Sequence, residues 1–213
     1  MAWRVTVLVG DPLRTPGDAL ARPVTGALEG ITPWSRQVEV AGGTKLSQRL
    51  AGQDGLPAGA VLVTPAGELP YELLLHAVLL TAEEGVARGG LLRALRNVLR
   101  QAAEWEVRVL VLPLLGAGVG QLSLEEAAEV LADALPELDG HDADLEIRIP
   151  TAGSTEAGVV RQTLARSFPG REGVQASLEP ASPEPASPEP ASPEPASPRA
   201  ASPRAASPGE EGA

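Results

Sequence analysis

Two glycine-containing segments are the places where this chain could hold a ligand. The first, Leu115-Gly116-Ala117-Gly118-Val119-Gly120, lies between a strand-like apolar run and a predicted helix. Glycines let the backbone approach a ligand closely, and free N–H groups near a helix start favour anions. The segment therefore favours a phosphate group. A tight glycine turn that holds no ligand is the alternative.

The second glycine segment is Ala41-Gly42-Gly43-Thr44, directly before a short predicted helix. Its backbone amides could also meet a phosphate, and a flexible loop that enters a helix is the alternative. Neither segment is a known nucleotide fingerprint. The dinucleotide fingerprint Gly-x-Gly-x-x-Gly would need its third glycine at position 121, one residue after Gly120, and that residue is Gln. The Gly-Lys-Ser/Thr of a Walker P-loop is not present.

Side chains suited to catalysis are few. The absence of cysteine excludes disulfides, thiolate metal sites and cysteine nucleophiles, and only His76 and His141 could offer imidazole. His76 lies in an apolar run, which favours a core histidine over a base. Asp11 could accept a hydrogen bond from an exocyclic amine, with a turn aspartate as the alternative. We predict no catalytic residue, no metal and no cofactor.

Charge and hydropathy narrow the possible partners. The net charge is −11 and Lys45 is the single lysine, so the chain lacks the clustered cations that bind nucleic acid. No apolar run reaches 18 residues, which predicts no membrane span. The apolar stretch at the N-terminus is too short for a signal peptide and lacks a cleavage region, so we expect a cytoplasmic protein.

Strand-like and helix-like segments alternate along the first 168 residues. Strands are predicted at Val5–Val9, Ala60–Thr64, Leu73–Leu80, Val107–Leu112 and Leu145–Ile149, and helices at Thr44–Ala51, Glu83–Glu104, from Ser123 onward, and Thr155–Phe168. This alternation predicts an α/β fold with a mixed, mainly parallel sheet. Five of the six residues of Val107–Leu112 are apolar, which places that strand centrally.

The C-terminal part has a different composition. Residues 179–208 are six pentads, four of Glu-Pro-Ala-Ser-Pro and two of Arg-Ala-Ala-Ser-Pro, and they contain no large apolar residue. Such a segment cannot bury a core and is expected to be disordered. We therefore divide the chain into a folded domain (1–168), a linker (169–178) and a Pro/Ala/Ser/Glu tail (179–213).

The order of these features resembles the macro domain, an α/β/α module that binds ADP-ribose. Gly10-Asp11-Pro12-Leu13 is similar to the family's Gly-Asp-Ile-Thr, and Gly42-Gly43 followed by Arg49-Leu50-Ala51-Gly52 is similar to its Gly-Gly…His-Arg-Ala-Ala-Gly. Val111-Leu112-Pro113 with Gly116–Gly120 and Glu125-Glu126-Ala127-Ala128 matches its later loop and helix. The resemblance spans about residues 5–168 and implies a three-layer α/β/α fold.

The resemblance also assigns roles. It implies that Asp11 holds the adenine amine, that Gly42 and Gly43 line the distal ribose and diphosphate, and that residues 115–120 wrap the diphosphate. Thr25 stands where the family has the second Asn of Asn-Ala-Ala-Asn, which contacts the distal ribose and serves many family hydrolases. Here that motif reads Arg22-Pro23-Val24-Thr25.

Three functions follow from these features. The first is a module that binds ADP-ribose or a related nucleotide diphosphate through two glycine loops. The second is a degenerate macro domain that serves as a scaffold, its pocket filled by Leu115, Val119 or the 31–41 segment. The third is an ADP-ribosyl hydrolase, which the lost Asn motif and the lack of a water-activating pair disfavour.

Overall fold

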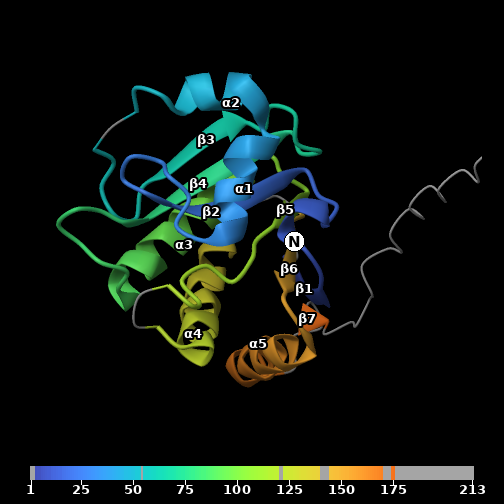
Figure 1. The fold of residues 1–213 in the computed structure, drawn as a ribbon. Coiled ribbons are helices and arrows are strands. Elements are labelled where there is room, and N and C mark those ends of the chain that lie inside the picture. Colours follow the sequence, from blue (N-terminus) through green and yellow to red (C-terminus); the bar gives the residue numbers. More distant parts are fainter. Residues whose placement is uncertain (1–2, 54, 120–121, 140–143, 170–173, 176–213) are drawn as a thin grey trace, which may run out of the picture. The chain divides into compact units, whose positions relative to one another are not determined.

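A seven-stranded mixed sheet forms the centre of the fold, with strand order β3-β4-β2-β5-β6-β1-β7 (Figure 1). The strands are β1 (Arg4–Val9), β2 (Ala19–Thr25), β3 (Val61–Pro65), β4 (Leu73–Leu80), β5 (Val109–Val111), β6 (Glu146–Thr151) and β7 (Val174–Gln175). All neighbours pair in parallel except β3, which is antiparallel to β4. The mixed, mainly parallel sheet is confirmed, and β5 is its middle strand.

These elements come from a computed structural model that describes residues 3–53, 55–119, 122–139, 144–169 and 174–175. The pentads of the tail and Gly120 lie outside the described residues. Two 3-10 turns, Pro12–Arg14 and Leu135–Leu138, complete the secondary structure of the described part. No helix within those ranges is both long and apolar enough to cross a membrane.

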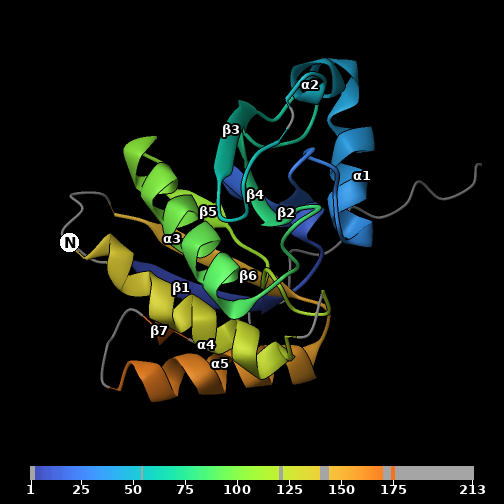
Figure 2. The same cartoon turned by 90° about the vertical axis from the view of Figure 1, so that its left-hand side faces the viewer.

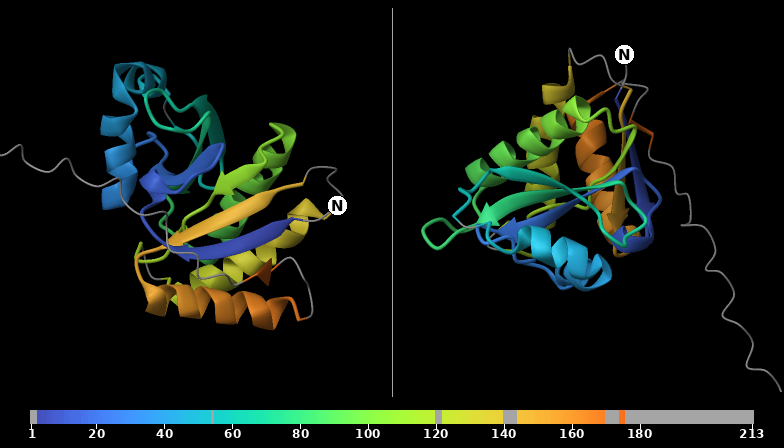
Figure 3. Two further views of the ribbon diagram at one scale, coloured as in Figure 1. Left: turned by 90° about the vertical axis from the view of Figure 1, so that its right-hand side faces the viewer. Right: turned by 90° about the horizontal axis from the view of Figure 1, so that it is seen from above.

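Helices cover both faces of the sheet, which gives three layers (Figures 2 and 3). On one face lie α1 (Pro33–Ala41) and α2 (Gly43–Leu50); on the other lie α3 (Arg88–Glu104), α4 (Leu124–Ala134) and α5 (Ser154–Ser167). The larger core lies under α3, α4 and α5, and a smaller one, which includes Leu20, Val38, Leu46 and Leu74, lies under α1 and α2. The α/β/α architecture is confirmed.

Residues 13–43 contain two elements, β2 and α1, that hydropathy patterns do not predict. β2 carries Arg22 and Pro23, residue types that are rare in a central strand. Proline is tolerated because β5 pairs only with Ala19 and Leu20, so the second half of β2 has one ladder neighbour, β4. The helix α1 begins at Pro33, where the Thr32 hydroxyl accepts the amide of Ser35 at 3.2 Å.

Candidate functional site

The carboxyl ends of the parallel strands bring three predicted segments to one edge of the sheet. Asp11 follows β1, Thr25 ends β2, and residues 112–119 follow β5. In open α/β sheets, ligands bind in the crevice at this edge. In strand order these ends run from β2 through β5 and β6 to β1, so the 112–119 loop lies between Thr25 and Asp11.

The loop after β5 offers free backbone donors. The positive φ values of Gly116 (85°) and Gly118 (68°) turn the chain tightly, and a Cβ at Gly116 would lie 2.7 Å from Leu91 Cδ2. Inside the loop one hydrogen bond forms, from the Val119 amide to the Gly116 carbonyl at 3.3 Å. Among the described residues, nothing accepts from the amides of residues 115–118. Amides without an internal acceptor can receive an anion where they face solvent, and Gly118 is the exposed residue of this loop.

The segment between β2 and α1 is closed by its own hydrogen bonds. The amides of Thr25 and Leu28 donate to the Glu29 and Thr25 carbonyls, each at 2.8 Å, and the Glu29 amide donates to Thr25 Oγ1 at 3.2 Å. The Gly26 amide donates to Leu80 O at 2.8 Å. The Gly30 amide donates to Glu39 Oε1 at 2.8 Å and the Ile31 amide to Pro23 O at 3.4 Å. This segment therefore resembles a hairpin more than a phosphate cradle.

Arg22 holds that segment from within the core. Its fully buried guanidinium donates from Nη2 to Leu28 O at 3.1 Å and from Nη1 to Ser35 O and Glu39 Oε1, both at 2.9 Å. Nε donates to His76 Nδ1 at 2.8 Å. Burial lowers the pKa of Arg22 although Glu39 opposes the shift, and four acceptors satisfy the charge.

His76 is a core residue, as its apolar strand predicts. Because Nδ1 accepts from Arg22, the ring proton sits on Nε2, which donates to Thr64 Oγ1 at 2.9 Å. Burial, reinforced by the nearby Arg22 charge, lowers the pKa of His76 to about 3. The imidazole is therefore neutral near pH 7 and lines no open site.

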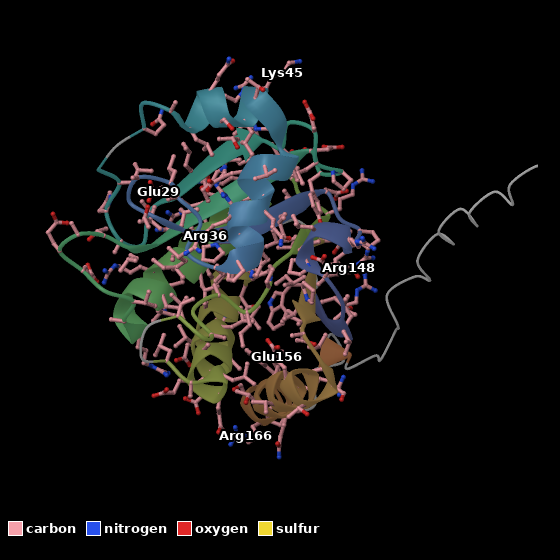
Figure 4. All side chains as sticks on the ribbon, viewed as in Figure 1. Glu29, Arg36, Lys45, Arg148, Glu156 and Arg166 are labelled. Atoms are coloured by element: carbon pink, nitrogen blue, oxygen red, sulfur yellow. The ribbon has the colours of Figure 1, made fainter. Side chains whose placement is uncertain are left out.

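The structure does not bring Gly42 and Gly43 to the loop after β5. They form the corner between α1 and α2, where Gly42 O accepts from Glu68 N at 3.2 Å. Glu68 belongs to the β3–β4 turn, and β4 starts there, so this corner lies at the amino end of the parallel strands. Figure 4 shows Lys45 on α2, well away from Glu29 on the β2–α1 segment. Gly42 and Gly43 were expected to face residues 115–120 across one ligand, and for the described residues 115–119 this juxtaposition is absent. The α1 helix, which the hydropathy pattern does not predict, directly precedes Gly42 and places both glycines at the amino end of the parallel strands.

Asp11 and Thr25 lie at the expected edge, each with a local role. Asp11 is exposed, and its Oδ1 accepts the Leu13 amide at 2.9 Å, which leaves Oδ2 for a further donor. Thr25 lines a pocket of about 640 Å³ on the β4 side of β2. This pocket contains Glu29, Glu83 and Glu84 and no lysine or arginine, so it is unsuited to a phosphate.

Arg22 and Glu39 are the residues whose place in the site the sequence did not reveal. An arginine within an otherwise apolar run is the available signal, since buried arginine is rare without a partner. Its partners come from α1, the β2–α1 segment and β4, where His76 lies beside it in the ladder. Among the described residues no group of three His, Asp or Glu could hold a metal ion.

Comparisons with known proteins point to one family. The macro domain sequence model matches residues 32–131. A macro domain-containing protein of Cupriavidus necator is 29% identical over 142 residues, which is 62% of this chain and 79% of that protein. Another, from Streptomyces coelicolor, is 28% identical over 138 residues, which is 62% of this chain and 82% of that protein.

Solved macrodomain structures share the fold. A mutant Oceanobacillus iheyensis macrodomain with ADPR superposes with a TM-score of 0.63 at 20% identity and covers 75% of this chain and 91% of its own. The Trypanosoma brucei macrodomain in complex with ADP-ribose superposes with a TM-score of 0.64 at 18% identity. The match covers 74% of this chain and 67% of that protein. At these identities the likeness concerns the fold.

Proposed function

Because the macro domain sequence model matches residues 32–131, we propose that this chain is a macro domain that binds ADP-ribose or a related nucleoside diphosphate without hydrolysing it. The observation that carries the proposal is the loop after β5, whose amides at residues 115–118 are free to receive a diphosphate. Two macrodomains of the same fold were solved with ADP-ribose, which supports this ligand class.

The proposal assigns each flank of the loop a part of the ligand. Asp11 lies toward β1 and has a carboxylate oxygen that can accept from an adenine amine. Residues 115–119 hold the diphosphate with neutral donors, which matters because the net charge of the chain, −11, repels anions. Gly120 keeps its predicted role in this loop. Gly42 and Gly43 leave the proposed ligand set because they lie at the other end of the sheet.

Calorimetric titration with ADP-ribose tests the proposal. Gly118→Glu places a negative charge at the exposed, open position of the loop and should weaken binding at least about tenfold, since each lost charge-assisted bond is worth roughly 1.5–3 kcal/mol. Gly52→Glu is the matched control, because Gly52 also has a positive φ (93°) and open space around it but follows α2. Equal binding by Gly118→Glu and wild type would refute the assigned location.

The base contact has its own test. Asp11→Ala should weaken the binding of ADP, because it removes the acceptor for the adenine amine. The binding of inosine diphosphate should not change, because this nucleotide lacks the exocyclic amine and keeps its phosphate contacts. An equal loss for both nucleotides would show that Asp11 acts on the fold of its turn and not on the base.

A scaffold without a nucleotide is the second candidate, and the closed β2–α1 segment favours it. With the amides of Thr25, Gly26 and residues 28–31 occupied, the β2 side of the proposed site offers one backbone donor, the Ala27 amide. Absence of heat with millimolar ADP-ribose would support this candidate over the binding module.

A further inference from the structure

The two sides of the proposed nucleotide loop differ in what they offer a ligand. On the β1 side stands Asp11 with a free carboxylate oxygen; on the β2 side stands the segment 25–31. A nucleoside diphosphate with its base toward Asp11 and its diphosphate over residues 115–118 directs any group beyond the second phosphate at segment 25–31. The chemistry of that segment therefore decides whether such a group is recognised.

Segment 25–31 has almost no backbone amide left for a ligand. Six of its seven backbone amides donate a hydrogen bond. Five of the acceptors belong to the segment itself, to β2 or to α1, and the sixth is Leu80 O of β4. Within these residues, all of which the structure describes, Ala27 has the one amide without an acceptor. Ala27 lines the acidic pocket on the β4 side of β2, away from the β5 loop.

Arg22 keeps the segment in this state. It joins Leu28 O, inside the segment, to Ser35 O and Glu39 Oε1 on α1, and Glu39 Oε1 also accepts from the Gly30 amide. Opening the segment would remove Leu28 O, one of the four acceptors of a fully buried guanidinium, and would separate the Gly30 amide from Glu39 Oε1, which is unfavourable. The segment cannot swing open to wrap a ligand unless this set of bonds breaks.

We infer that this chain recognises a nucleoside diphosphate only as far as its second phosphate, with Arg22 and Glu39 as the positioning residues that set this limit. The inference rests on the proposed function. Its consequence is that ADP and ADP-ribose bind with similar affinity, because the terminal ribose of ADP-ribose meets a segment in which six of the seven backbone amides already have acceptors. AMP should bind far more weakly, because it offers the 115–118 amides one phosphate instead of two.

Titration of the full chain with ADP, ADP-ribose and AMP is the first measurement. We expect the dissociation constants of ADP and ADP-ribose to agree within about threefold and AMP to be at least about tenfold weaker. If ADP-ribose binds at least tenfold more tightly than ADP, the inference is wrong and the proposed function remains. If neither diphosphate binds, the proposed function fails and the inference with it.

Variants of Glu39 test the positioning role. Glu39→Ala removes the acceptor shared by Arg22 and the Gly30 amide, whereas Glu39→Gln retains a side-chain oxygen there. In Glu39→Ala we expect faster hydrogen exchange at Gly30 and at least a threefold shift of the affinity ratio toward ADP-ribose, with ADP binding unchanged. Glu39→Gln should restore both wild-type values. A Gly30 amide that stays protected in Glu39→Ala, or a ratio that does not move, overturns the role of Glu39.

Discussion

Lowering the pH from 7 to 5 should destabilise the protein through His76 in particular. In the folded state the Nδ1 lone pair accepts from Arg22 Nε at 2.8 Å, and Nε2 donates to Thr64 Oγ1. A second proton would have to bind at Nδ1, which already accepts the N–H of the buried, positively charged Arg22. Burial and this charge hold the pKa of His76 at about 3, below its ordinary value of 6.5.

The sign and size follow from linkage. Between pH 6.5 and about 3 the unfolded chain binds a proton at His76 and the folded chain does not, so stability is fully present above pH 6.5 and falls as the pH falls. Each pH unit within this window is worth about 1.4 kcal/mol. From pH 7 to pH 5 the expected loss from His76 is therefore about 2 kcal/mol.

Urea unfolding at pH 7, 6 and 5 measures the effect, with His76→Gln as the control. The glutamine amide can accept from Arg22 and donate to Thr64, but it does not titrate. The wild type should lose about 2 kcal/mol more than His76→Gln between pH 7 and 5. Equal losses in the two proteins would show that His76 is protonated in the folded state or that its Arg22 contact is not formed.

Two further predictions concern single elements. Ser123→Ala should lower the unfolding free energy by about 1 kcal/mol in urea, because Ser123 Oγ accepts the Glu126 amide at 3.2 Å and the Glu126 carboxylate accepts the Ser123 amide at 2.8 Å. Ser123→Thr can keep the cap and should be nearly as stable as the wild type. An equal loss of stability in both variants would contradict the capping role. Deletion of residues 179–213 should leave the unfolding free energy within about 1 kcal/mol of the full chain, since the pentads contain no large apolar side chain to bury, whereas a larger loss would show that the tail packs on the domain.

Local sequence patterns were enough to predict several elements of the fold. The apolar run of β4 was predicted with its observed bounds, Leu73–Leu80, and α4 begins after the predicted cap, Ser123. These elements are read correctly because hydrophobic period and capping chemistry depend on neighbours within one or two turns. The positive φ values at Gly116 and Gly118 fit the tight turn that glycines suggest there.

Which residues lie at the carboxyl edge of the sheet depends on contacts between distant parts of the chain. Gly42 and Gly43 look like a phosphate loop in sequence, but the α1 helix carries them to the amino end of the sheet, against Glu68. Arg22 looks misplaced in a strand until Glu39 and His76, 17 and 54 residues away in the chain, supply its acceptors. A pattern of residues records neither of these facts, because satisfaction of a buried charge depends on acceptors that only folding brings within hydrogen-bonding distance.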